Sequence, residues 1–242
     1  MVLKENDVLK CPPFPLLTFK GFSWTAELNL DYWRDCLTRV DLFHGKTSHD
    51  GSVSLSLTPL KKSPSPEQVQ AYQYFLENSD SVFDSLLKAV FDSYPAERAS
   101  YREGYGWSED LDEDEKEEFE DDYGIFVPEL FTPQDLKKVI CLRIIHVGAE
   151  ALNGFSYIGF EFDCNWDEEH GLGVLMHRDR VVSVGQADVS FGSADEPNAI
   201  DLNDLYGPPD FDESSITAGV EDVSTPEQKA MMAELMKRKG LL

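Results

Sequence analysis

Four apolar-rich segments follow one another between residues 139 and 185, and they constrain the fold more than any other feature of the chain. They run from Val139 to Val147, Phe155 to Cys164, Leu172 to His177 and Arg180 to Gly185. Apolar side chains recur at every second position along them, most clearly in Phe155 to Cys164, as expected of strands with a buried face. Connections this short join antiparallel neighbours, because parallel strands need a long crossover. We therefore predict an α+β fold built on an antiparallel β-sheet, with a meander at 139–185 and helices packed on one face.

The strand period also predicts which side chains point inward. The expected core positions are Ile140, Leu142, Ile144, Ile158, Phe160, Phe162, Cys164, Leu172, Val174 and Met176. Arg143 and Glu161 fall on the polar face of neighbouring strands and are expected to form a cross-strand ion pair. His146 continues the apolar face and is interpreted as a histidine at the edge of the core.

Further strands are expected within 15–19, 22–30 and 52–57, which gives a sheet of about six or seven strands. The helical part of the fold begins at Ser65-Pro66-Glu67-Gln68, which has the residues of a capping box with proline in the first turn. We expect a break at 78–80 and an end at Tyr94-Pro95. A short helix is expected after Thr132-Pro133.

We expect one α+β domain over 1–192 with an acidic insertion at about 107–124. Residues 193–224 are predicted to be an acidic linker or an extended wrap, and 225–242 a C-terminal helix. The stretch from Glu109 to Asp122 is nearly all acidic, with Lys116 as its single base. Such a block is usually a solvated loop, and with aromatic anchors it can also be a binding surface, so both interpretations stay open.

The charge balance restricts the classes of partner. The chain has 46 acidic and 21 basic residues and a formal net charge of −25. We expect no binding to nucleic acid or to an anionic membrane, because both need Lys and Arg on the protein. A basic protein would be attracted and steered by this charge. Solubility alone is the other explanation of the acidity.

The four cysteines are far apart and form no C-x-x-C pair, which disfavours a zinc finger or a redox motif. The N-terminus lacks the basic-then-apolar pattern of a signal peptide, so we expect a cytoplasmic protein. In that reducing compartment the cysteines are predicted to be buried free thiols.

The stretch from Asn165 to Gly173 concentrates one aromatic ring, three carboxylates, one imidazole and two glycines between two predicted strands. As a metal site, its acidic residues would be joined by His170, His177 and Cys164. As an acid–base site, a carboxylate of the turn would pair with His170, although no nucleophile accompanies them.

The third interpretation of this stretch is structural. Asp167 would accept local backbone N–H groups in an Asx turn, and Trp166 would pack the turn onto the sheet. His170 would then donate to a carboxylate or a carbonyl.

Several of these segments resemble one uncharacterised bacterial family of domains of unknown function. The resemblance rests on a W-D-E-E-H-G-L-G signature at 166–173, with further matching residues at Tyr157 to Cys164, His177, Val181 to Asp188, Glu67-Gln68 and Tyr94-Pro95. It covers roughly 14–192 and implies no established activity. In size and acidity such proteins are similar to bacterial immunity proteins, which is an analogy.

We therefore expect a soluble acidic protein-binding module, such as an immunity or inhibitor protein that neutralises a basic partner like a bacterial toxin. The alternative is a metal-dependent hydrolase or other enzyme that uses the 165–177 hairpin. No catalytic residue, metal ligand or cofactor is assigned. The expected binding residues are Trp166, Asp167, Glu168, Glu169, His170, Asp110, Asp112, Glu113 and Asp114.

Overall fold

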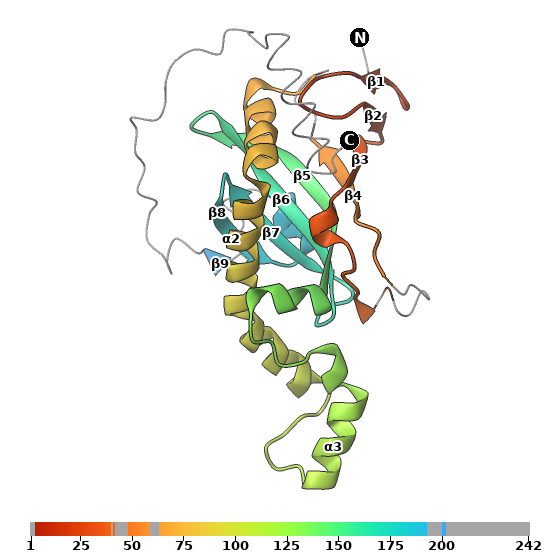
Figure 1. Ribbon diagram of the computed structural model, residues 1–242, viewed down its shortest axis with the longest axis vertical. Coiled ribbons are helices and arrows are strands. Elements are labelled where there is room, and N and C mark those ends of the chain that lie inside the picture. The colour runs from red at the N-terminus through yellow and green to blue at the C-terminus, as the bar shows by residue number, and fades with distance from the viewer. Residues whose placement is uncertain (1–2, 40, 42–47, 59–62, 193–199, 202–242) are drawn as a thin grey trace.

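A computed structural model of the chain describes residues 3–39, 41, 48–58, 63–192 and 200–201. Within these residues, nine strands form one sheet in which spatial order follows chain order (Figure 1). The strands are β1 (Val8–Leu9), β2 (Leu17–Lys20), β3 (Ser23–Asn29), β4 (Ser52–Leu57), β5 (Ile140–Leu152), β6 (Phe155–Cys164), β7 (Leu172–His177), β8 (Arg180–Gly185) and β9 (Ile200–Asp201). The fold is α+β, as predicted.

The predicted meander is confirmed, because β5, β6, β7 and β8 pair consecutively and antiparallel. The sheet has more strands than expected, and β4 and β5 pair in parallel. A crossover through helix α2 (Pro66–Gly104) joins these two strands, as parallel neighbours require. The expected linker at 193–224 lies outside the described residues apart from β9, and the C-terminal helix lies wholly outside them.

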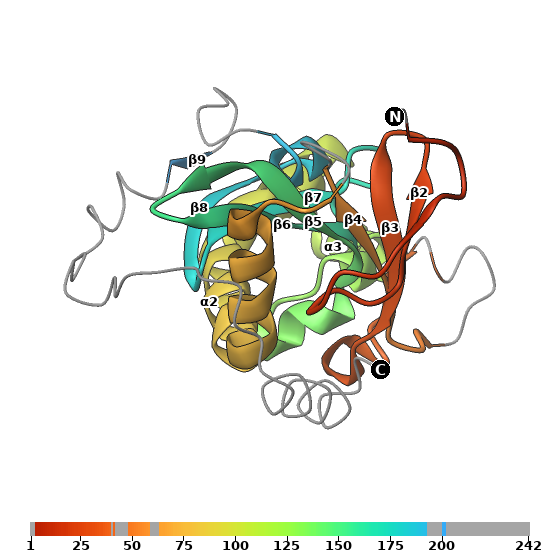
Figure 2. The same ribbon diagram turned by 90° about the horizontal axis from the view of Figure 1, so that it is seen from above.

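The core lies between the sheet and α2. Phe75 and Phe83 of α2 pack against Phe160 of β6 with ring centroids 5.8 and 6.0 Å apart. Trp33, in the 3-10 helix η1 (Asp31–Trp33), packs edge-on against Phe83 and against Phe162. All five rings are buried, so this aromatic cluster joins α2 to the sheet. Figure 2 shows these two layers from above.

The start of α2 agrees with the prediction. Ser65 accepts a hydrogen bond from Gln68 N, and the Gln68 side chain accepts one from Ser65 N. The same buried Gln68 donates to Thr58 O, directly after β4, and to Gly148 O within β5, and so ties the helix to both strands.

The predicted end at Tyr94-Pro95 is wrong, because α2 continues to Gly104 with Pro95 inside it. The predicted break near residue 78 is a kink at Asn78, whose φ and ψ are −123° and 21°. The 127–128 backbone holds the helix on both sides of Pro95, because Tyr94 Oη donates to Pro128 O and Arg98 Nε donates to Val127 O. Tertiary contacts therefore override the local preference of proline.

A bulge in β5 changes the predicted side-chain alternation. The register with β6 slips between Leu142 and Ile144, so Ile145 and Val147 point into the core in place of Ile144. The same slip places His146 on the polar face beside Glu161. The predicted pair of Arg143 with Glu161 is therefore wrong.

Two short helices complete the described fold near the sheet. The predicted helix after Thr132 is the 3-10 helix η3 (Pro133–Lys138). A second 3-10 helix, η4 (Ala187–Ser190), crosses β6 and β7 at Gly159 and Gly173. These glycines alternate with Phe160 and Val174, so η4 lies on the face opposite to α2.

The contact between η4 and β6 leaves no room for a side chain at residue 159. A Cβ atom there would overlap the carbonyl oxygen of Ser190. We expect Gly159→Ala to lower the free energy of unfolding by about 3 kcal/mol, measured by urea denaturation. The control is Gly104→Ala, which has open space and should leave stability unchanged or slightly raised. Equal effects of the two substitutions would contradict the close packing of η4.

Candidate functional site

The turn at 165–171 is held by its own side chains. Asp167 Oδ1 accepts the His170 N–H at 3.0 Å and lies 3.0 Å from His170 Nδ1. Asp167 Oδ2 accepts from Gln186 Nε2 at 3.1 Å, and Gly171 N donates to Asp167 O. The carboxylate thus forms an Asx-type turn, although it accepts the N–H three residues on, where the strict Asx turn uses the N–H two residues on.

The turn is also anchored to the rest of the molecule. Trp166 packs edge-on against Tyr94 of α2, with ring centroids 5.4 Å apart. Buried Asn165 accepts from Arg39 N and donates to Phe126 O. The turn is therefore rigidly attached, while Glu168, Glu169 and His170 remain exposed.

Two carboxyl groups of this region have shifted pKa values. Partial burial works to raise the pKa of Asp167, but the hydrogen bonds from His170 and Gln186 outweigh it and hold the pKa below 3.8. Nearby Glu97 has a raised pKa because of burial and, secondarily, the charge of Asp167.

The candidate metal ligands of the hairpin are only partly brought together. Asp167 and His170 are in contact, but His177 is at the other end of β7, roughly 20 Å away at the rise of a strand. His177 Nε2 lies 2.9 Å from Leu152 O. Burial raises the pKa of the Cys164 thiol to about 12, and its Sγ donates a hydrogen bond to Asp167 O at 3.4 Å.

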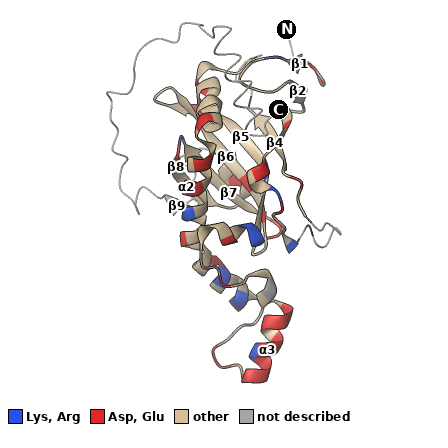
Figure 3. Ribbon diagram, in the orientation of Figure 1, with Lys and Arg blue, Asp and Glu red and all other residues tan. Residues whose placement is uncertain are grey.

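The acidic insertion contains a helix, α3 (Glu113–Asp122), which extends away from the sheet at the end of α2 (Figure 3). Asp112 caps it by accepting from Glu115 N, while Glu115 accepts from Asp112 N. Acidic residues in the first turn suit the helix dipole. Residues 113–122 thus form a helix that a capping box and a buried anchor stabilise, and their carboxylates are exposed to solvent, so both interpretations of 109–122 stay open.

That anchor is a cluster around Arg102 of α2. Its guanidinium lies 3.8 Å from the Trp107 ring and 5.1 Å from the Phe119 ring, and Nη2 is 2.6 Å from Glu120 Oε1. Phe119 is buried and packs on Tyr123, which packs on Tyr105. We call residues 105–123 the acidic arm. Its exposed carboxylates are Glu109, Asp110, Asp112, Glu113, Asp114, Glu115, Glu117, Glu118, Glu120, Asp121 and Asp122.

Arg39 connects the turn to the base of this arm. Its Nη1 lies 3.1 Å from Glu168 Oε1 and 3.3 Å from Tyr101 Oη. Tyr101 packs on Tyr105, which is the first residue of the arm. The two predicted groups of binding residues are therefore linked by a short chain of contacts.

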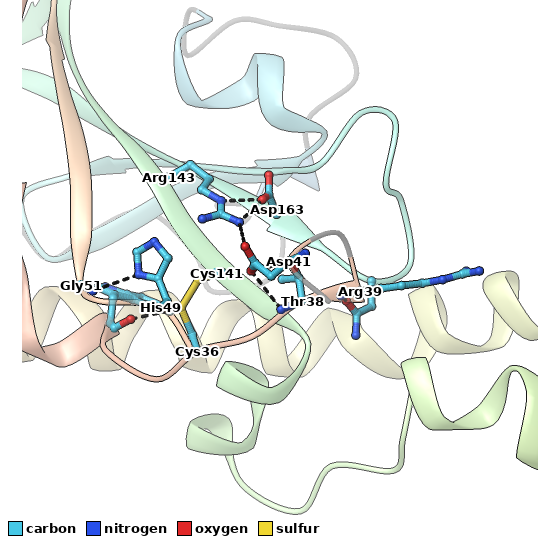
Figure 4. Close-up of polar contacts among 11 residues, drawn as sticks. Cys36, Thr38, Arg39, Asp41, His49, Gly51, Cys141, Arg143 and Asp163 are labelled. Carbon is cyan, nitrogen blue, oxygen red and sulfur yellow. Dashed lines mark hydrogen bonds and ion pairs between the residues drawn. A yellow bond between two sulfur atoms is a disulfide. The ribbon is translucent and has the colours of Figure 1, made fainter. Parts of the chain in front are cut away.

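Sequence reasoning did not find a third polar region, on the face of the sheet opposite to α2. Arg143 pairs there with Asp163 and, at 2.6 Å, with Asp41, whose side chain is 1% exposed (Figure 4). Beside it, His146 Nε2 lies 2.8 Å from Glu161 Oε2. Asp41 and Arg143 are 102 positions apart, and a bulge aims Arg143, so neither spacing nor alternation could signal this cluster.

A hollow of about 490 Å³ lies next to this cluster. Its lining residues are Glu27, Ser48, His49, Asp50, Ser52, Ser54, Arg143 and Ile144. The guanidinium of Arg143 already forms ion pairs with Asp41 and Asp163. Glu27 and Asp50 of the lining therefore make the hollow acidic overall.

The cysteines differ from the prediction. Cys36 and Cys141 form a disulfide, whereas Cys11 and Cys164 are free. The free-thiol prediction is wrong for the first two, which are 105 positions apart and are brought together only by the fold. His49 lies beside them in the close-up of Figure 4, and its Nδ1 accepts the Gly51 N–H at 3.1 Å.

Within the described residues, no helix is both long enough and apolar enough to cross a membrane. A family described as "Domain of unknown function (DUF6985)" matches residues 24–191, from β3 to just past η4. Neither the curated proteins nor the solved structures contain a significant match.

The Asx turn gives a prediction about stability and pH. Asp167→Ala should lower the free energy of unfolding by about 1 kcal/mol at pH 7, and Asp167→Asn by less, because asparagine keeps one acceptor. The folded pKa is depressed, so the contribution of the charge is present above pH 3.8 and is lost as pH falls through the folded pKa. Denaturation of the three proteins across this range measures both effects. A difference between the wild type and Asp167→Asn that grows on acidification would contradict the assignment.

The buried pair on the polar face gives a second prediction. Arg143→Met removes the guanidinium partner of the buried Asp41 and should cost about 3 kcal/mol of unfolding free energy. Adding Asp41→Asn should recover more than half of this loss in a double-mutant cycle. Arg34→Met is the matched control, since its pair with Asp31 is exposed and should matter little. Additive losses from the first two substitutions would refute the coupling.

Proposed function

This chain belongs to the DUF6985 family of domains of unknown function, and from its own residues we propose that it is a soluble, cytoplasmic, acidic module that binds and neutralises a basic protein. The observation that carries the proposal is the acidic arm. Its helix is folded, held by Arg102 and extended away from the sheet, so its carboxylates are presented on a preformed surface.

The arm is already ordered before any partner binds, and this distinguishes it from an acidic segment that only makes the protein soluble. A disordered acidic segment would have to be ordered on binding, which weakens binding. Here the capping box and the Phe119 contacts have already ordered it. Long-range attraction then speeds encounter with a basic surface, and a fixed pattern of charges selects among such surfaces.

The turn extends the same surface. Arg39 links Glu168 to Tyr101 at the base of the arm, and exposed Glu169 and His170 lie beside Glu168 in the chain. A partner that covers both regions would meet Trp166 to His170 and the start of the arm. A bacterial toxin with a basic surface is the kind of partner that fits an immunity or inhibitor role.

The hydrolase alternative has less support. Its metal ligands would come from the 165–177 hairpin, but His177 contacts Leu152 O at the other end of β7, and Cys164 is buried with its thiol donating to Asp167 O.

The test removes charge from the arm without removing its cap. The variant replaces Asp110 and Asp114 by Asn and Glu113 and Glu117 by Gln, and leaves Asp112 in place. Proteins captured on immobilised wild type from lysate of the native cell are eluted with salt, and the basic protein released is purified. We expect the variant to bind this protein about tenfold or more weakly, with a shallower dependence on salt.

A matched control carries the same loss of charge elsewhere on the surface. It replaces four exposed carboxylates outside the arm, those of Glu77, Glu129, Glu150 and Asp188. The control should bind almost as the wild type does. If it loses as much affinity as the arm variant, net charge and not the arm carries binding. If the arm variant keeps full affinity, the proposed surface is wrong.

A further inference from the structure

A group of three metal-binding side chains lies apart from the turn and the arm. Cys36 follows η1, His49 precedes β4 and Cys141 is in β5, so the three come from distant parts of the chain. All three are buried, and their sulfur and ring-nitrogen atoms lie within 4.8 Å of one another. Within the described residues, this is the one such group of three or more His, Cys, Asp or Glu side chains.

We propose that Cys36, Cys141 and His49 form a zinc-binding site when the Cys36–Cys141 disulfide is reduced. The proposal concerns a different part of the molecule from the acidic arm and does not depend on the arm's function. It requires the cysteines to be reduced, which is the expected state in a cytoplasmic compartment.

The distances suit the metal. Zinc binds thiolate sulfur at about 2.3 Å and imidazole nitrogen at about 2.0–2.1 Å, so tetrahedral ligand atoms lie roughly 3.5–3.8 Å apart. The present spread of up to 4.8 Å is close to this. Reduction of the disulfide lets the two sulfur atoms separate from bonding distance to that spacing. Three protein ligands leave a fourth position for water.

Disulfide reduction and zinc binding balance in electrons and protons. A dithiol reductant gives two electrons and two protons to the S–S bond, which breaks into two thiols while the reductant becomes a disulfide. Zinc then displaces both thiol protons and binds two thiolates. The disulfide has no thiolate to offer, so the oxidised protein should not bind the metal here.

The surroundings favour a thiolate site that contains metal over two free thiolates. Both sulfur atoms are removed from solvent, where uncompensated anions would be costly, and Zn²⁺ supplies the compensating charge. His49 Nδ1 accepts a hydrogen bond from Gly51 N in the oxidised protein, so the neutral ring carries its proton on Nε2, and zinc binding has to replace either this hydrogen bond or that proton. The mixture of soft sulfur and imidazole ligands selects zinc over magnesium or calcium.

The experiment uses the full chain, oxidised or reduced with a phosphine under argon, and incubated with zinc chloride before desalting. Elemental analysis should find about one zinc per reduced chain and none in the oxidised chain. Cobalt chloride added to the reduced protein should give the intense visible and near-ultraviolet bands of tetrahedral thiolate coordination. A reduced wild type that retains no zinc in competition with a weak chelator would overturn the proposal.

Variants identify the ligands. Cys36→Ser, Cys141→Ser and His49→Asn should each weaken zinc binding by about tenfold or more. Cys11→Ser and Cys164→Ala remove thiols outside the group and should bind as the wild type does. His49→Asn keeps both cysteines, so it tests the site even if a cysteine variant fails to fold. Unchanged zinc affinity in folded His49→Asn, checked by circular dichroism, would remove His49 from the site and refute the three-ligand assignment.

Discussion

The apolar face of the β5–β8 meander has to be kept from water, and the rest of the structure depends on how α2 covers it. Phe75 and Phe83 of the helix meet Phe160 of β6 in one aromatic cluster. Burial of rings on this scale supplies the main favourable term in forming the two layers. Because α2 is long enough to pass beyond the sheet, the same packing fixes where the acidic arm is placed (Figure 1).

The two faces of the sheet have different roles. The face toward α2 is a continuous apolar core, whereas the opposite face is covered over β6 and β7 by η4 and carries polar side chains toward β3 and β4. That division permits a buried core and an acidic hollow on one sheet. The bulge at Arg143 turns its guanidinium toward Asp41 and Asp163.

In this acidic chain, three arginines form connections within the fold. Arg102 holds the arm through two rings and Glu120, Arg39 joins the turn to Tyr101, and Arg143 neutralises a buried carboxylate. Using these cations internally leaves the exposed carboxylates of α3 with little local compensation. The negative surface is thus a consequence of composition and of where these arginines are used.

The sequence by itself determined the elements with a strong local signal. The alternation in β4 and β6, the capping box at Ser65 and the short connections of the meander all predict the observed structure, because strand period, cap chemistry and loop length act over a few residues. The hydrogen bonds of the Asp167 turn belong to the same class, since donor and acceptor are three positions apart. Side-chain chemistry at that range can be inferred from the residues alone.

Only the tertiary structure decided the features that depend on distant partners. Helix α2 passes Pro95 because the 127–128 backbone holds it, and α3 is folded because Phe119 packs near Arg102. The slip at Arg143, its pairing with Asp41 and the meeting of Cys36, Cys141 and His49 join segments separated by up to about a hundred residues. No local pattern encodes such encounters, because they are set by how the whole sheet and its helix pack.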